Sequence, residues 1–314
     1  MHAVCTAGRR GSLLLRLAAI TLSVTSCAAQ ESTSAPRAPA AAPMTTMGEQ
    51  GDDGVFTIVA VGDIASSPLA GQATAMLIPG IGPDAVLTLG DNAYEDGSIS
   101  NYTDNYDPTW GAFKSITKPV PGNHDYRTFG AAGYFEYFRD QVAGQPYYAW
   151  DAGSWRMYAL NCEIDCSDGS EQVRWLTEDL AAHPGRPALA YMHKPLFSCS
   201  TGHNPSQQIM RIWDALRQSN GQILLSGHNH AYERFSLLTG DGEPSDDGLR
   251  QFVVGTGGNT LNPVEEPCPG READYDQFRG VLKLELGPDS YSWEFLTVGG
   301  EVADSGTQGV GPLS

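Results

Sequence analysis

Short apolar runs that each stop at a glycine and an acid recur in the first part of this chain, and they constrain its fold more than any other feature. Val55–Val61 (VFTIVAV) stops at a Gly-Asp pair whose acid is Asp63, and Ala85–Leu89 (AVLTL) stops in the same way at Asp91. Runs of this length and composition are typical of buried strands, and the segment between them is long enough for a crossover connection. The pattern therefore predicts parallel strands in an α/β fold. In such sheets ligands bind beyond the carboxyl ends of the strands, where both acids are expected.

Three later strands are followed by polar residues in the same way. Each strand is given with the residues that follow it: Lys118–Val120 with Asn123–Asp125, Ala188–Met192 with His193, and Gly221–Leu225 with Ser226–Arg234. Two intervening segments, 173–181 and 209–216, carry the one-sided apolar stripe of an amphipathic helix. We read these stripes as core.

Further strands are expected near the C-terminus with no helices between them. They are Arg234–Leu238, Gln251–Val254, Val281–Leu286 and Tyr291–Val298. Their order predicts a second, largely antiparallel sheet packed on the first. Two sheets with outer helices would form a four-layer α/β/β/α sandwich.

The stretch Ser226–Arg234 (SGHNHAYER) contains two histidines that suggest a metal site. On an extended or turning backbone residues at i and i+2 point the same way, so the imidazoles of His228 and His230 can face one point. Neutral imidazole is a common ligand for transition metals. Two surface histidines in a polar loop are the alternative. The polar residues at the other strand ends favour the metal site.

The N-terminal part reads as targeting sequence. Residues 1–27 combine a basic start, the apolar run Leu17–Ser26 and a lipobox-like Val24–Cys27, so we expect a secretory signal of lipoprotein type, with ordinary cleavage near Ala28 as the alternative. Residues 28–53 are rich in Ala, Pro, Ser and Thr and are expected to be a disordered linker. The folded domain is expected over residues 54–305, with a flexible tail at 306–314. The protein would be exported and anchored by lipid to the outer face of the membrane, or secreted.

The acidic balance of the chain limits its partners. The formal net charge is −18, which disfavours nucleic acids and anionic membranes as partners, so we expect membrane contact only through the lipid anchor. Bound cations can reverse the sign of the charge locally, so phosphate esters remain possible substrates. No protein partner is inferred.

Four cysteines follow the signal, and their number and spacing suggest disulfides in an exported protein. Cys162 and Cys166 are close enough to close one loop, which leaves Cys199 and Cys268 to pair over a long range. A zinc site made of all four thiolates is the competing interpretation, although the usual C-x2-C spacing is missing.

The motifs together resemble the calcineurin-like metallophosphoesterase superfamily, and within it the purple acid phosphatases. The five motifs are GDI at Asp63, GDNAY at Asp91–Tyr94, GNHD at Asn123–Asp125, YMH at His193 and GHNHAYER at His228–Arg234. Most of the superfamily has a histidine ligand two residues after the first acid, but here that position is Ala65. Tyr94 matches the Gly-Asp-x-x-Tyr of the purple acid phosphatases instead.

The resemblance implies a four-layer metallophosphoesterase sandwich with two mixed β-sheets and a site for two metal ions. One metal would be held by Asp63, Asp91, Tyr94 and His230, and the other by Asp91, Asn123, His193 and His228. The first would be Fe(III) and the second Fe, Zn or Mn.

The implied activity is hydrolysis of phosphomonoesters by attack of a metal-bound hydroxide. His124 would act on the leaving group with Asp125 orienting it, and His203 and Lys194 would contact the substrate. A phosphodiesterase, or a nucleotide- or phospholipid-directed hydrolase, on the same site is the alternative. A lipoprotein that binds metal or phosphate without turnover is a rival from another class.

Overall fold

The computed structural model describes residues 54–311. The expected signal, lipidation site and linker therefore lie outside the described residues. None of the helices within this range has both the length and the apolar character needed to cross a membrane.

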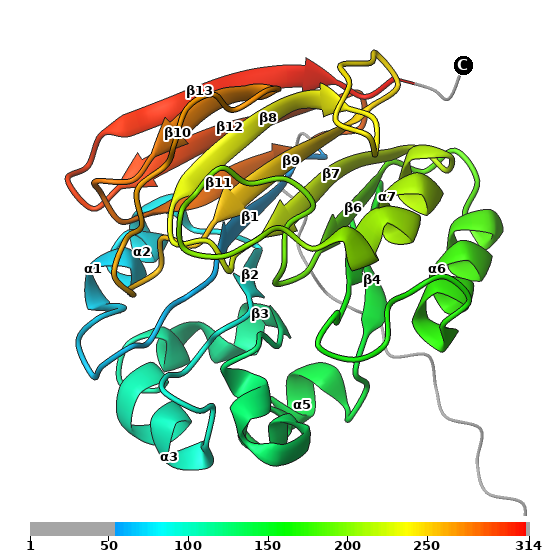
Figure 1. The fold of residues 1–314 in the computed structure, drawn as a ribbon. Helices are drawn as coiled ribbons and strands as arrows, with labels where there is room; N and C mark the ends of the chain where they lie inside the picture. Colours follow the sequence, from blue (N-terminus) through cyan, green and yellow to red (C-terminus); the bar gives the residue numbers. More distant parts are fainter. Residues whose placement is uncertain (1–53, 312–314) are drawn as a thin grey trace, which may run out of the picture. The chain divides into compact units, whose positions relative to one another are not determined.

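Thirteen strands form the framework of the described part (Figure 1). They are β1 (Phe56–Val61), β2 (Ala85–Leu89), β3 (Thr117–Val120), β4 (Tyr148–Ala152), β5 (Trp155–Ala159), β6 (Ala188–Tyr191), β7 (Gly221–Ser226), β8 (Tyr232–Leu238), β9 (Leu249–Val254), β10 (Arg271–Tyr275), β11 (Gly280–Leu286), β12 (Ser290–Thr297) and β13 (Val302–Gly309). The five strands expected in residues 55–225 are present as β1, β2, β3, β6 and β7, within about one residue of their predicted ends.

Helices connect the strands of the first two thirds of the domain. The α-helices are α1 (Gln72–Ala75), α2 (Ile78–Ile81), α3 (Ile99–Asn101), α4 (Ala132–Tyr137), α5 (Arg139–Val142), α6 (Glu171–Ala182) and α7 (Met210–Arg217). A π-helical turn η1 (Tyr102–Tyr106) and the 3₁₀ segments η2 (Trp110–Ile116), η3 (Asp125–Arg127), η4 (Phe129–Ala131) and η5 (Gln207–Ile209) complete the set.

The strands form two mixed sheets, as the resemblance implied. The first has the order β13-β12-β11-β1-β2-β3, and the second has the order β10-β8-β9-β7-β6-β5-β4. In the first, β1, β2 and β3 are parallel, and β11 joins the other edge of β1 in the antiparallel direction. In the second, β5, β6, β7 and β9 are parallel. The expectation that the late strands make a separate antiparallel sheet is therefore wrong, because they divide between both sheets and complete the hydrogen bonding of strands formed earlier in the chain.

Alternation along the strands of the second sheet separates two apolar cores. Leu189 and Tyr191 of β6 pack in the same core as the strands of the first sheet, whereas Ala188 and Ala190 pack in the core that contains α6 and α7. Ser170 caps the N-terminus of α6, since its hydroxyl accepts a hydrogen bond from the backbone of this helix's first turn. On the opposite side α1, α2 and the segment from α3 to α5 cover β1–β3 (Figure 1). The four-layer arrangement is confirmed.

The C-terminal end of the domain differs from the expected one. The prediction of a flexible tail from residue 306 is wrong at its start, since β13 continues to Gly309 and pairs with β12 along its length. Polar, glycine-containing residues on an edge strand carry little apolar periodicity, and their backbone hydrogen bonds to β12 form the strand instead. The same reason explains why β10 (READY) was not predicted.

Candidate metal centre

The carboxyl ends of parallel strands from both sheets converge on one site. Asp63, Asp91 and Asn123 follow β1, β2 and β3 of the first sheet. His193 follows β6 of the second sheet, and the two histidines of the GHNH motif follow β7. Backbone hydrogen bonds join the turns, since the Asp63 amide donates to the Gly90 carbonyl over 3.0 Å. The packing of the two sheets therefore brings together residues that are up to 167 positions apart in the chain.

Three of the expected ligands have left-handed backbone conformations. The φ angles are 60° at Asp63, 49° at Asp91 and 69° at His228. A non-glycine residue in this region costs of order 1–3 kcal/mol, and such residues concentrate at functional sites. Here the geometry turns each side chain back over the strand end. Three of the six non-glycine residues with positive φ in the described part are therefore expected ligands.

One group of donors lies around Asp63. The Tyr94 hydroxyl is 2.9 Å from Asp63 Oδ1 and 3.1 Å from Asp91 Oδ2. His230 Nε2 is 3.3 Å from the same Asp63 oxygen. The Tyr94 side chain is almost fully buried. Two carboxylates, a phenol and an imidazole thus meet at one point.

A second group of donors lies on the other side of Asp91. His193 Nε2 is 3.4 Å from Asp91 Oδ2, 3.1 Å from Asn123 Oδ1 and 3.2 Å from His228 Nδ1. The ligand atoms of Asp63, Asp91 and His193 also lie within 4.8 Å of one another. The Asp91 carboxylate therefore contacts the Tyr94 hydroxyl of the first group and the His193 ring of the second, which is the position of a bridging ligand.

Backbone carbonyls select the ring nitrogens that face the site. His193 Nδ1 is 2.8 Å from the Leu89 carbonyl, and His230 Nδ1 is 2.8 Å from the Thr260 carbonyl. A carbonyl only accepts, so each Nδ1 carries the proton and each Nε2 presents a lone pair to the site. His228 has the opposite orientation, with Nδ1 toward His193. All three rings are thus oriented as metal-ligating imidazoles are.

Two glycines leave the space that this packing needs. A Cβ at Gly227 would lie 2.6 Å from Asp63 Oδ2, and one at Gly90, where φ is 87°, would lie in the His193 ring. Both positions therefore require glycine, one for close approach and the other also for its positive φ.

The charges at the site are strongly coupled. Burial lowers the pKa of His193, but the charge of Asp91 and its contact with the ring outweigh burial and raise the pKa to about 10. Burial and the charge of His193 lower the pKa of His228 to about 2. Burial and the charges of Asp63 and Asp91 raise the pKa of the Tyr94 phenol well above its usual value of 10. The phenol would therefore ionise only beside a strongly polarising cation.

The donor set fits two metal ions. Buried carboxylates in close contact repel one another unless a cation lies between them, and imidazole nitrogens that face each other need one for the same reason. Three of the four donors in the first group are oxygens, whereas the second group has two oxygen and two nitrogen donors. Asp63, Asp91, Tyr94 and His230 would hold one ion, and Asp91, Asn123, His193 and His228 would hold the other.

His124 lies beside this centre in an unexpected environment. Its Nε2 is 3.9 Å from Asp91 Oδ2 and 3.0 Å from an Arg127 guanidinium nitrogen, and its Nδ1 is 2.7 Å from the Glu95 carbonyl. Guanidinium only donates, so Nε2 accepts from Arg127 and Nδ1 carries the proton. The expectation that Asp125 orients His124 is wrong. The Asp125 carboxylate faces inward and accepts hydrogen bonds from the Gly122 and Asn92 amides and the Tyr102 hydroxyl.

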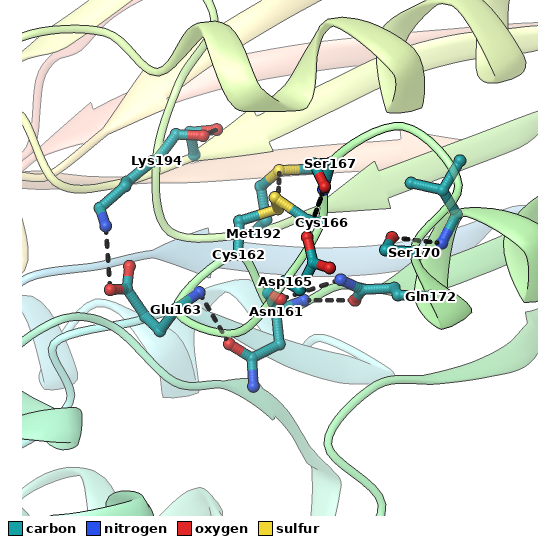
Figure 2. Close-up of a disulfide and its surroundings, with 12 residues drawn as sticks. Asn161, Cys162, Glu163, Asp165, Cys166, Ser167, Ser170, Gln172, Met192 and Lys194 are labelled. Atoms are coloured by element: carbon teal, nitrogen blue, oxygen red, sulfur yellow. Dashed lines mark hydrogen bonds and ion pairs between the residues drawn. A yellow bond between two sulfur atoms is a disulfide. The ribbon is translucent and has the colours of Figure 1, made fainter.

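The two predicted substrate contacts also lie at the edge of the centre. The His203 ring stacks on the His228 ring with centroids 4.4 Å apart, and its amide donates to Asn229 Oδ1. The Lys194 ammonium is 2.9 Å from a carboxylate oxygen of Glu163. Figure 2 draws this pair. His203 thus lies against a predicted ligand, and Lys194 is paired with an acid next to one.

The predicted disulfides are confirmed. Cys162 is bonded to Cys166 and Cys199 to Cys268. The first closes the loop after β5 that carries Glu163, and the second ties the loop that carries His203 to residue 268. A zinc site made of the four thiolates is therefore excluded.

The sequence reasoning missed several residues that shape the site. Glu95, Arg127 and Glu163 contact predicted site residues but belong to no motif. The only signal in the sequence that could have indicated them was a charged side chain close to a ligand motif, in a chain with few cations. The carbonyls of Leu89 and Thr260 could not have been found, since a backbone carbonyl carries no sequence signature.

Comparison with known proteins supports the class that this fold and centre define. The family model described as Calcineurin-like phosphoesterase matches residues 56–232, and the chain belongs to that family.

Within the family the chain is similar to purple acid phosphatases. Purple acid phosphatase 15 of Arabidopsis thaliana is 28% identical over 60% of this chain and 43% of its own length. Purple acid phosphatase 22 of the same plant is 24% identical over 63% of this chain and 52% of its own length. The chain thus spans about half the length of these relatives. The structure of a purple acid phosphatase from yellow lupin (Lupinus luteus) seeds shares the fold, with a TM-score of 0.64 at 18% identity, covering 81% of this chain and 53% of the lupin chain.

Proposed function

We propose that this protein is a binuclear metal-dependent phosphatase that hydrolyses phosphomonoesters. The observation that carries the proposal is the position of Asp91, whose carboxylate contacts Tyr94 on one side and His193 on the other. Family membership supports a metal-dependent phosphoester hydrolase. The monoester preference and the two-metal mechanism are the proposed part.

The chemistry divides between the ions and the chain. When bound, two ions held by these residues would neutralise phosphate charge and make a nucleophile available at modest pH. The chain holds them through Asp91 and orients the imidazoles through backbone carbonyls. Lys194 and His203 stand at the rim to bind substrate oxygens.

His124 is proposed to act on the leaving group. Its Nε2 is the ring nitrogen nearest Asp91 and accepts from Arg127 in the present arrangement. For His124 to donate a proton to a departing alkoxide, Nε2 must be protonated and Arg127 must release it, because two donors cannot share a hydrogen bond. Substrate binding would supply a competing acceptor for the guanidinium.

We propose Fe(III) for the ion beside Tyr94 and Fe, Zn or Mn for its neighbour. A phenolate is a hard anionic donor suited to ferric iron. The second group, with two oxygen and two nitrogen donors, accepts several divalent ions, and affinity order alone does not select among them.

The test is a metal-analysed preparation assayed on p-nitrophenyl phosphate and on its bis-ester from acid to alkaline pH. We expect hydrolysis of the monoester, loss of activity on chelation and its return on adding metal. Faster hydrolysis of the bis-ester would identify a phosphodiesterase instead. Two bound ions with no turnover of either substrate would identify a binding protein.

We further propose that the protein is exported and lipid-anchored at Cys27. The lipobox-like sequence before it and the Ala/Pro/Ser/Thr-rich stretch behind it support this. Cys27→Ala should move the protein from the membrane fraction to the medium. An unchanged distribution between membrane and medium would contradict the anchor.

A further inference from the structure

Lys194, next to His193, is not a free cation at the rim of the metal centre. Its ammonium lies 2.9 Å from Glu163 Oε2, and its side chain is 26% exposed whereas that of Glu163 is 9% exposed. Its backbone carbonyl also accepts a hydrogen bond from Ser226 at the end of β7. One N–H of the ammonium is used by Glu163, and the other two remain for a ligand.

Glu163 is itself held in place from several directions (Figure 2). Its amide donates to the Asn161 side chain over 3.1 Å. Asn161 in turn exchanges two hydrogen bonds with the Gln172 side chain, at 2.8 and 2.9 Å. The Cys162–Cys166 disulfide closes the loop around Glu163. The backbone at Glu163 is therefore fixed by the loop, and its carboxylate pairs with Lys194.

The same loop also contacts the other half of the centre. Asn161 Nδ2 donates to the Tyr126 hydroxyl over 2.9 Å, and Tyr126 belongs to η3, directly after Asn123 and His124. The loop thus ties the end of β6 in one sheet to the segment after β3 in the other. A change in this loop would therefore act on the segments that follow β3 and β6, which carry the predicted ligands Asn123 and His193.

Stability alone does not explain this arrangement. Glu163 Oε1 is buried and accepts no hydrogen bond from the residues that the structure describes. Burying a carboxylate with one oxygen unpartnered costs stability, and a buried ion pair is often no better than an apolar pair of similar size. A role in placing the Lys194 ammonium accounts for both the pair and the framework around it.

We propose that Glu163 is a positioning residue that fixes the Lys194 ammonium so that its two remaining N–H groups bind phosphate oxygens of the substrate. The Cys162–Cys166 loop sets the position of Glu163. The inference rests on the proposed phosphatase function, but it concerns phosphate binding and can be tested through that alone. Because it acts through Lys194, Glu163 should affect binding of the phosphate group more than turnover.

The experiment is a double-mutant cycle with Glu163→Gln, Lys194→Met and the double variant, all metal-loaded and checked for metal content. Glu178→Gln, which removes an exposed charge from α6, is the matched control. The readouts are KM and kcat on p-nitrophenyl phosphate and the Kd of inorganic phosphate by calorimetry. Each single variant should raise KM and Kd about tenfold, the loss of one charge-assisted hydrogen bond. The metal content should stay at the wild-type level in every variant, and in Glu163→Gln the change in KM and Kd should exceed any change in kcat.

The decisive result is non-additivity. In the Lys194→Met background, Glu163→Gln should add nothing, because the group that it positions is already gone. An additive effect would show a separate structural role and overturn the proposal, as would loss of metal in Glu163→Gln alone. The double variant removes both charges together, so it remains informative if the single glutamine variant folds poorly.

Two further results separate this inference from the proposed function. A protein without phosphatase activity but with Kd shifts as above would refute the function and keep the positioning role. Active enzyme with unchanged KM and Kd in every variant would keep the function and refute the positioning role. Cys162→Ser with Cys166→Ser should raise KM and Kd in the same direction as Glu163→Gln, and unchanged values would refute the contribution of the loop.

Discussion

Replacing Tyr94 with phenylalanine tests the metal centre most directly, since it deletes one oxygen and keeps the ring. The hydroxyl is buried and lies within hydrogen-bond distance of both Asp63 and Asp91. Ala65 stands where most of the superfamily has a histidine ligand, so the first ion has few other donors. Under the proposed assignment, the substitution removes a ligand to that ion, and it deletes a hydroxyl that contacts both carboxylates.

The size of the effect follows from these contacts. In metal-free protein the hydroxyl donates to a buried carboxylate, and such a hydrogen bond contributes about 1.5–3 kcal/mol. Tyr94→Phe should lower the free energy of unfolding by that amount in chelator, measured by urea denaturation. The ring itself contacts His124, with centroids 4.4 Å apart, and this packing should survive.

The spectrum of iron-loaded protein gives the second readout. If the phenolate binds Fe(III), wild type should show a broad visible charge-transfer band that is absent from Tyr94→Phe. Burial and the charges of Asp63 and Asp91 hold the Tyr94 pKa high. The phenol should therefore ionise, and the band should appear, only when the cation is bound. An identical band in both proteins would refute phenolate ligation. No band in either would refute ferric iron at this position.

Three further predictions concern the bridge, the packing of the sheets and the long disulfide. Asp91→Asn should lose both ions and nearly all activity, and full occupancy by elemental analysis would contradict its bridging role. Asp304→Asn should lower the free energy of unfolding by about 3 kcal/mol at pH 7, because the largely buried carboxylate pairs with Arg234 over 2.7 Å. Burial raises the Asp304 pKa, but the hydrogen bond from Arg234 outweighs it and the pKa falls below its usual 3.8. The stabilisation is therefore present above about pH 4 and lost as pH falls through the folded-state pKa. The difference between wild type and variant in urea denaturation should shrink below about pH 4, and a constant difference would refute this. Replacing Cys199 and Cys268, 69 positions apart, with serine should cost about 4 kcal/mol in the same assay, and a loss under about 1 kcal/mol would exclude the chain-entropy argument.

Most of the predicted metal ligands could be identified from local sequence. Apolar runs marked the ends of the strands, and the polar residues just after them supplied the ligands, because parallel strands present their carboxyl ends at one edge. Asp63, Asp91 and His193 were found in this way. The disulfides followed from cysteine number and spacing. These features depend on neighbours within a few residues, which is the range over which periodicity and turn chemistry operate.

Local sequence could not predict how the C-terminal strands divide between the two sheets. β11 pairs with β1 although more than 200 residues separate them. Backbone hydrogen bonding is the same for any sequence, so strand partners depend on which edges the rest of the fold leaves open. The polar end of the domain became β13 for this reason, and it brought Asp304 to Arg234 on the other sheet.

The side-chain contacts around the site also depend on which distant segments pack together. Asp125 was expected beside His124 because the two are adjacent in the chain, but Asp125 turned inward to the Tyr102 hydroxyl and Arg127 took its place. Glu163 and Lys194, 31 positions apart, met because β5 and β6 are neighbours. Strand ends and ligand types are short-range properties of the chain. Which charged side chains face them depends on distant segments that pack together, and no local pattern records that contact.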